Sequence, residues 1–292
     1  MADAAIRWGV CTTVRAPAEQ VLAVVAHHLS IGAAHVWVHF DDPEDPAFER
    51  LARIPDVTPI RCDARWWGRI RPERHQNRQS RNILRLYRQA PLPWIAHLDV
   101  DEFIVGNVGR ALATDADMVR IRPWEALHDP ALPDDIFTAR HFRAAAVKAR
   151  RLAFGQHADL FPSGMVSHQH GKAIFRTGRG LEPRIHGAFR DGQRVEGIDF
   201  SESLALLHFH AEDPARWADR LHFRLTRGAY AGNAALRDHL LSLDESGILA
   251  FHAETHMPPP ERMAELLRLG LLQEADLTLR RKVEELCERQ TI

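Results

Sequence analysis

The sequence has few cysteines and no long apolar run. Its three cysteines, Cys11, Cys62 and Cys287, lie far apart and form no CxxC pair, so we expect no disulfide framework and no cysteine-based metal site. No apolar run approaches the roughly 18 residues of a membrane-spanning helix, and the N-terminal segment MADAAIRWGV lacks the apolar core of a signal peptide. We therefore expect a cytoplasmic protein without a transmembrane segment, for which a peripheral membrane contact stays open.

The sequence also lacks an excess of charge of one sign. Its 38 Lys and Arg residues balance 39 Asp and Glu residues, which gives a formal net charge of −1. This balance offers no global attraction for nucleic acid, so we expect no nucleic-acid partner. No GxxxxGK phosphate loop, nucleophilic Ser or Cys motif, internal repeat or low-complexity segment occurs. The 45% of hydrophobic residues is ordinary for a soluble globular protein with a sizeable core.

The first half of the chain alternates between strand-like and helix-like segments. Strands are expected at 7–14, 34–40, 57–63, 94–105 and 118–124. Helices are expected at 17–32, from Pro46 onward, and at 74–89. The β-α-β-α-β order at the start predicts a parallel sheet with right-handed crossovers.

The second half of the chain is less regular. Residues 160–189 are rich in Gly, His and basic residues and read as a loop-rich region with short strand-like pieces such as KAIF. A strand is expected at 203–213, an amphipathic helix from Asp213 and Pro214, and two helices at 261–269 and 273–289. We predict an α/β domain at 1–257 and a helical C-terminal tail at 258–292.

Two acidic clusters follow strands of the predicted sheet. Asp41 and Asp42 follow the second strand, and Asp99, Asp101 and Glu102 lie inside the apolar run 94–105. Ligands of open α/β sheets bind beyond the carboxyl ends of the strands, and strand residues i and i+2 point the same way, so Asp99 and Asp101 should converge. Converging carboxylates favour Mg²⁺ or Mn²⁺ shared with a phosphate. The alternative is a strand-end turn with solvated or arginine-paired acids.

The stretch WIAHLDVDEFIV resembles the LDxDEF signature of bacterial family-2-like glycosyltransferases, which have the GT-A nucleotide-sugar-binding fold. Three further stretches resemble segments of that family: HHLSIGAAHVWVHFDD, GKAIFR and LLHFHAEDPARWADRLHFRLTRG. The resemblance covers about residues 7–230. The chain departs from the family at FDDPEDP, where an Asn and an Asp-Gly stretch are usual, and at Arg224, where a Lys is usual.

The resemblance implies a GT-A-like, Rossmann-type and mostly parallel sheet flanked by helices. It implies transfer of a sugar from a UDP- or GDP-linked donor to the hydroxyl of a glycan or other acceptor. Asp99 and Asp101 would hold Mn²⁺ or Mg²⁺ on the diphosphate, where the ion offsets charge on the leaving group. Asp41 or Asp42 would lie near the base or ribose, and Lys172 near phosphate or acceptor. A solvated edge-strand lysine is the alternative for Lys172.

Several histidines are candidates for the same site. His208 and His210 lie two apart on a late strand, and the resemblance implies that this pair completes the metal site; a role in the core without metal is the alternative. His186 resembles a family histidine near the acceptor, with a structural role as the alternative. His168 and His170 lie in a Gly-rich loop, without further ligands at the spacing of a zinc site.

An inverting transfer, as in family-2 relatives, uses a carboxylate base that deprotonates the acceptor. Glu102, Glu182 and Asp199 are candidates for this base, and we count Asp101, Glu102 and His186 as expected catalytic residues. Two other functions stay open. A nucleotidyltransferase would be expected to have a Gly-rich loop after its first strand, where TTVRAPAEQ has none. A non-catalytic carbohydrate- or protein-binding module would tolerate loss of the acids, which are intact here.

The segment between the third and fourth strands is dense in arginine. One or two of these arginines could contact phosphate, and a solvated helix face is the alternative. The neighbouring Trp66 and Trp67 could stack on a sugar or base, although a lid or core contact is the favoured interpretation. The arginines are Arg65, Arg69, Arg71, Arg74, Arg78 and Arg81.

Overall fold

The computed structural model describes residues 6–132, 136–167, 169–210, 213–228 and 230–288. The chain forms two compact units, and each is built from separate stretches of sequence. Unit 1 contains Met1–Arg122, Gly171–Leu206 and Thr278–Ile292, and unit 2 contains Pro123–His170 and Leu207–Leu277. The last boundary between the units lies between Leu277 and Thr278, 20 residues beyond residue 257, after which the sequence predicts a helical tail.

Four parallel strands form the centre of unit 1, in the order β3-β2-β1-β4. They are β1 (Trp8–Val14), β2 (His35–Phe40), β3 (Val57–Arg61) and β4 (Trp94–Leu98). Thr12 of β1 lies opposite Val38 of β2 on one side and Leu98 of β4 on the other. The chain moves outward from β1 to β3 and then returns to the other side of β1. The strand order therefore reverses between β1 and β4, which is the topological switch point at which such sheets bind ligands.

Antiparallel strands extend the sheet beyond β4. β8 (Lys172–Arg176) pairs with β4 and with β6 (Met118–Ala126). β5 (Glu102–Gly106) pairs with β12 (Phe200–His208). A separate small antiparallel sheet contains β9 (Glu182–Arg184), β10 (Gly187–Arg190) and β11 (Gln193–Arg194).

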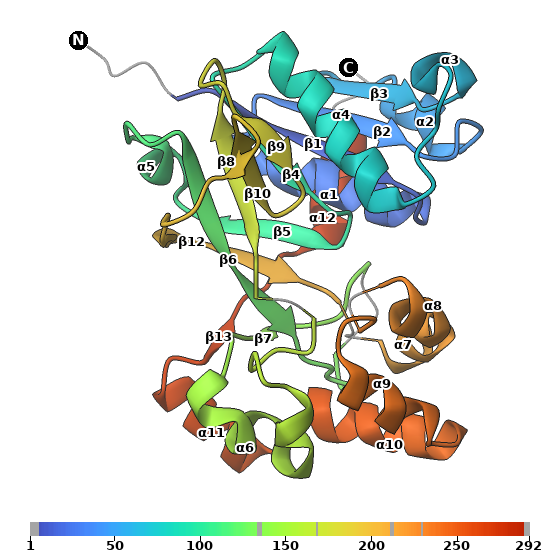
Figure 1. The fold of residues 1–292 in the computed structure, drawn as a ribbon, viewed down its shortest axis with the longest axis vertical. Coiled ribbons are helices and arrows are strands. Elements are labelled where there is room, and N and C mark those ends of the chain that lie inside the picture. The colour runs from blue at the N-terminus through green and yellow to red at the C-terminus, as the bar shows by residue number, and fades with distance from the viewer. Residues whose placement is uncertain (1–5, 133–135, 168, 211–212, 229, 289–292) are drawn as a thin grey trace. The chain divides into compact units, whose positions relative to one another are not determined.

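Helices flank both faces of this sheet (Figure 1). On one face, Ile83 and Leu86 of α4 (His75–Gln89) pack against Cys11 and Ile95 of the strands. The crossover from β3 to β4 runs opposite to the one from β1 to β2, so right-handed connections place α1 (Ala18–Ser30) on the other face. The remaining helices of unit 1 are α2 (Ala47–Leu51), α3 (Ala64–Trp67), α5 (Val108–Leu112) and α12 (Leu279–Glu288), the last of which packs on α1. The predicted α/β class, with a mostly parallel sheet, flanking helices and a C-terminal helix, is confirmed.

The run 94–105 contains two strands instead of one. β4 ends at Leu98, β5 begins at Glu102, and the Glu102 N–H donates to the Asp99 carbonyl at 3.2 Å, which closes a turn. The i, i+2 rule for strands therefore does not place Asp99 and Asp101 on one side, because these residues are in the turn. The turn, and not strand geometry as the sequence suggested, sets the directions of these two carboxylates.

Unit 2 is mainly helical. Its short strands β7 (His141–Arg143) and β13 (Leu272–Glu274) pair with each other, and β7 also pairs with the end of β6. Its helices are α6 (Arg150–Phe154), α7 (Pro214–Asp219), α8 (Leu221–Thr226), α9 (Ala234–Leu241), α10 (Glu245–His256) and α11 (Pro260–Arg268). Their core contains Phe154, Phe161, Trp217, Tyr230 and Phe251. Across the described ranges, every helix is too short or too polar to cross a bilayer.

Candidate functional site

Two acids of unit 1 lie at the carboxyl ends of strands on either side of β1. Asp41 follows β2 and Asp99 follows β4. Successive residues of α4 hold them: Arg78 binds Asp41, and Gln79 donates to Asp99. The first turns of α4 therefore lie at the edge of the sheet where the switch point is, and they join the two acids into one polar cluster.

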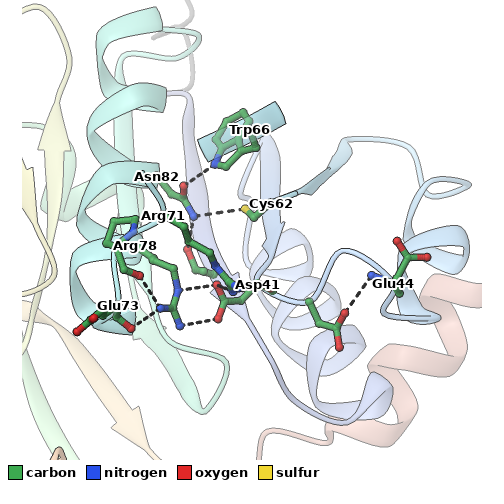
Figure 2. Close-up of polar contacts among 11 residues, drawn as sticks. Asp41, Glu44, Cys62, Trp66, Arg71, Glu73, Arg78 and Asn82 are labelled. Atoms are coloured by element: carbon green, nitrogen blue, oxygen red, sulfur yellow. Dashed lines mark hydrogen bonds and ion pairs between the residues drawn. The ribbon is translucent and has the colours of Figure 1, made fainter. Parts of the chain in front are cut away.

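Asp41 is held by two arginines. Nε and Nη2 of Arg78 lie 2.7 Å from Oδ1 and 2.7 Å from Oδ2, a two-pronged pairing, and Nη2 of Arg71 lies 3.0 Å from Oδ1 (Figure 2). Nη1 of Arg78 is itself oriented by the carbonyl oxygens of Pro72 and Glu73, at 2.8 and 2.6 Å. Burial raises the pKa of Asp41, but the hydrogen bonds from Arg78 and Arg71 outweigh it and leave the pKa below its usual value. The carboxylate is thus ionised and fixed in orientation.

Asp99 is held by a lysine from β8. Nζ of Lys172 lies 2.7 Å from Oδ2 of Asp99 and 3.1 Å from Oε2 of Glu102, and the Lys172 side chain is buried. Burial alone would raise the pKa of Asp99 and lower that of Lys172. Their mutual attraction prevails, so the pKa of Asp99 is lowered well below its usual range and that of Lys172 is raised. Lys172 is therefore an ammonium ion at the switch point, not a solvated edge-strand lysine.

Glu102 contacts both members of this pair. It is 0% exposed, and its Oε2 accepts the Asp99 backbone N–H at 2.8 Å as well as the Lys172 ammonium. A catalytic base must reach the acceptor hydroxyl, and this position gives Glu102 no such access. Glu102 is therefore a positioning residue for Asp99, which differs from its expected catalytic role. Asp101 lies in the turn and is half-buried.

Two further histidines of unit 1 lie near the acids. His186 belongs to the loop between β9 and β10, and its Nδ1 lies 2.9 Å from the carbonyl oxygen of Gly171, to which it donates. His186 is close enough to Asp99 to lower the pKa of that carboxyl. His97 of β4 is buried, and within the described ranges neither of its ring nitrogens has a hydrogen-bond partner. Burial, followed by the Lys172 charge, lowers the pKa of His97 to about 3.

The remaining expected site residues lie outside this cluster. Asp42 is exposed and accepts the Glu44 N–H at 3.0 Å in the turn after β2. Glu182 forms an ion pair with Arg184 at 3.5 Å, and Asp199 is exposed. His170 is exposed, and His168 falls outside the described residues.

His208 and His210 belong to unit 2, whereas Asp99 and Asp101 belong to unit 1. The ring centres of His208 and His210 lie 5.1 Å apart, so the two side chains point to the same side of the chain. Nη1 of Arg224 lies 2.7 Å from Nε2 of His210, and Nη2 of Arg224 donates to the His210 carbonyl at 2.7 Å. A metal ion at His210 would have to displace this guanidinium. Arg224 thus fixes the position of His210.

The expected metal site has few donor atoms of its own. Among the residues that the structure describes, no three His, Cys, Asp or Glu side chains are placed to hold a metal ion. Asp99 already has a cation, Lys172, on one oxygen. An ion at Asp99 and Asp101 would take its other ligands from a diphosphate and water, which is a common coordination for Mg²⁺. The residues present therefore fit only an ion that takes most of its ligands from a diphosphate and water. The divalent cofactor stays a prediction.

Sequence reasoning found the acids of the cluster but missed part of what holds them. Arg71 and Arg78 belong to the arginine-dense segment, of which one or two members could contact phosphate, and both bind Asp41. Gln79 was not singled out, because a glutamine on a polar helix face carries no signal of its own. Trp67 is buried, in line with a core contact, and Trp66 is half-buried.

Comparison with known proteins assigns the chain to no family. No protein-family model and no curated protein matches the chain. Among solved structures, the chain is similar to the crystal structure of HddC from Yersinia pseudotuberculosis, with 9% sequence identity and a TM-score of 0.39. That match covers 75% of this chain and 99% of the other. A similarity of this size carries no argument about function.

Proposed function

We propose that the protein is a glycosyltransferase that binds a UDP- or GDP-linked sugar at the carboxyl ends of β1, β2 and β4 in unit 1. The observation that carries the proposal is the pairing of two strand-end acids, Asp41 and Asp99, with adjacent residues of α4 at the switch point. A sheet of this kind binds its ligands at that edge. The resemblance of the LDVDEF stretch to family-2-like glycosyltransferases supplies the reaction class.

The cluster offers both cations and an ionised acceptor to a nucleoside diphosphate. Lys172, Arg71 and Arg78 are cations at this edge, each paired with an acid of the cluster, and the N-terminal end of α4 adds the positive end of a helix dipole. Asp41 supplies an ionised acceptor fixed by Arg78, of the kind that binds ribose hydroxyls or base N–H groups. In the proposal, Asp41 contacts the nucleoside, and Asp99 with Lys172 lies toward the diphosphate.

A divalent ion, if bound, would be held by Asp99 and Asp101 and would offset negative charge on the departing diphosphate. The chain's own residues do the rest. Lys172 stays protonated beside the diphosphate, because Asp99 and Glu102 raise its pKa. Glu102 fixes the turn through the Asp99 N–H, so the two acids of the DVD motif keep their positions.

In the proposed reaction, the bond from the anomeric carbon to the diphosphate oxygen breaks, and a bond forms from that carbon to the acceptor oxygen. The acceptor proton passes to a base, and the electron pair of the broken bond leaves with the nucleoside diphosphate. Asp101 is half-buried in the turn, and His186 is half-buried near Asp99, so these two are the proposed candidates for the base. The acceptor is a glycan or another hydroxyl compound.

The direct test is turnover. The purified chain would be incubated with UDP- and GDP-linked hexoses, with Mn²⁺, Mg²⁺ or EDTA, and the release of UDP or GDP measured. We expect release with one nucleotide class and a fall of about 100-fold in Asp101→Asn, since one charged ligand or base is lost. Asp115→Asn is the matched control, because Asp115 is an exposed acid near the opposite end of the strands.

Equal rates in Asp101→Asn and in the control would reject the role of Asp101. A chain that instead releases pyrophosphate from nucleoside triphosphates and sugar phosphates would be a nucleotidyltransferase. Binding of a glycan without nucleotide release from any donor would support the non-catalytic module.

A further inference from the structure

A polar pocket of unit 1, whose lining contains none of the residues of the acid cluster, lies between α3 and the later turns of α4. It has a volume of about 620 Å³, within the usual range of about 300–1,000 Å³ for small-ligand pockets. Residues from the end of β3, from α3 and from α4 line it. They include Arg61, Asp63, Arg65, Trp66, Arg85 and Arg88.

The lining carries a strong excess of positive charge. Four arginines face a single carboxylate, that of Asp63, which is already the acceptor for the Trp66 backbone N–H at 2.8 Å. Arg61 has a carboxylate partner outside the pocket, Glu49, at 2.7 Å. Within the described ranges, Arg65, Arg85 and Arg88 form no ion pair. Three guanidinium ions without an ion-pair partner, beside the single carboxylate of Asp63, leave an excess of positive charge that attracts an anion.

Part of this lining is fixed in advance. Trp66 donates its indole N–H to Asn82 Oδ1 at 3.0 Å, which holds the ring against α4 (Figure 2). Arg85 then donates to the Trp66 carbonyl at 2.8 Å, and its guanidinium lies 4.7 Å from the centre of the Trp66 ring. These contacts use one Nη of Arg85, so its remaining donors can serve a ligand. Arg88 follows three residues later on the same side of α4.

We infer that this pocket is a separate binding site for a phosphoryl group. Guanidinium ions pair with phosphate through two parallel hydrogen bonds, and a phosphate monoester carries about −1.5 to −2 charges at neutral pH, which suits several unpaired arginines better than a single carboxylate does. The phosphoryl group comes either from a soluble phosphate compound or from a phospholipid headgroup. The site needs no divalent ion, because its own arginines supply the positive charge.

The test measures binding of inorganic pyrophosphate to the full chain by calorimetry, in EDTA so that metal-dependent binding is silent. The pocket variant is Arg85→Gln/Arg88→Gln. The control is Arg50→Gln/Arg53→Gln, which removes two exposed arginines of unit 1 outside the pocket. We expect the pocket variant to bind at least about 10-fold more weakly, because two charge-assisted contacts are lost, and the control to bind within about 2-fold of wild type.

Co-sedimentation with phosphatidylcholine vesicles, with and without phosphatidic acid, separates the two sources. Vesicle binding that needs phosphatidic acid and is lost in the pocket variant identifies the headgroup, and pyrophosphate binding without vesicle binding identifies a soluble compound. Arg88→Gln alone, at an exposed position, keeps the test valid if the double variant fails to fold. The inference is overturned if wild type binds neither probe, or if the pocket variants bind both as the control does.

Discussion

Lys172 lies between two carboxylates at the switch point of the sheet, and its side chain is inaccessible to solvent. Breaking a buried ion pair by removing one partner usually costs about 3–5 kcal/mol, because the remaining charge is left buried. The Asp99 side chain is 31% exposed, so water can solvate part of its charge. The Glu102 side chain is buried, so its charge would be left without solvation. Most of the cost of losing Lys172 therefore falls on Glu102.

The first residue-scale prediction concerns Lys172→Met, which keeps the length of the side chain and removes its charge. We expect the free energy of unfolding at pH 7 to fall by about 3 kcal/mol. The folded pKa of Asp99 is depressed, so its contribution to stability is full above about pH 4, the unfolded value, and is lost as the pH falls further. The difference from wild type should therefore shrink toward pH 3.

Lys148→Met is the control for this experiment, because Lys148 is an exposed lysine of unit 2. Denaturant unfolding at pH 7, 5 and 3 measures all three proteins. A Lys172→Met protein as stable at pH 7 as Lys148→Met would show that the ammonium is not needed by the acids.

At this scale the sequence pattern drew attention to Asp41 and Asp99, since acids at the ends of strand-like runs are conspicuous, and the resemblance drew attention to Lys172. Sequence reasoning did not foresee that Glu102 is buried against Lys172. The carboxylate looks available in the sequence, and only the turn at 99–102 directs it inward onto Lys172. Gln79 binds Asp99, which is 20 residues away in the sequence. A contact between residues so far apart produces no local sequence pattern from which it could be predicted.

At the scale of elements, two histidines of α1 hold strand β5. Nε2 of His27 lies 2.8 Å from the Ile104 carbonyl oxygen, and the Ile104 N–H donates to Nε2 of His28 at 3.2 Å. Lys282 of α12 reaches Nδ1 of His27 at 3.1 Å. The Nε2 of His28 must be unprotonated to accept, and Nδ1 of His27 must be unprotonated to accept from Lys282. The HH stretch therefore fixes the strand that follows the acid-bearing turn.

The second prediction follows from these neutral histidines. In the folded protein, burial lowers the pKa of His28 to about 4, whereas in the unfolded chain the pKa of a histidine is about 6.5. As the pH falls below about 6.5, the unfolded chain therefore binds a proton at this residue before the folded protein does. Stability should therefore decrease from about pH 6.5 toward pH 4. When the unfolded chain binds one proton more than the folded protein, the free energy of unfolding falls by about 1.4 kcal/mol for each pH unit. In His28→Gln we expect the slope between pH 6 and pH 5 to be smaller by close to one proton.

His222→Gln, at an exposed position of α8, is the control. Unfolding free energies at quarter-unit pH steps give the slopes. The role of His28 is contradicted if His28→Gln and His222→Gln have the same slope.

The alternation of strands and helices in the first half of the chain was predictable, because each element repeats its apolar residues with the period of its type. The split of 94–105 into β4 and β5 was not, since the turn contains no Gly or Pro and the apolar run continues beyond it. Helix α10 was also missed. Its buried face includes His252, Thr255 and His256, which do not register as an apolar stripe.

At the scale of the whole molecule, the chain enters unit 1 three times and unit 2 twice. Such a division depends on contacts between distant segments, so no composition shift in the sequence marks it. The sequence predicts one helical tail from residue 258 onward, yet α11 lies in unit 2 and α12 in unit 1. The predicted helix 273–289 is in fact β13 followed by α12.

The measurement that tests the central claim most directly is a melting curve of wild type and Asp101→Ala, each with UDP plus Mn²⁺, with GDP plus Mn²⁺, and without ligand. A ligand that binds only the native state raises the melting temperature, so wild type should shift with one nucleotide. Asp101→Ala should melt within about 2 °C of wild type without ligand, because a half-buried turn residue contributes little, and should show no shift. An Asp101→Ala protein that is clearly destabilised without ligand, yet shifts with nucleotide and Mn²⁺ as wild type does, would contradict the proposal.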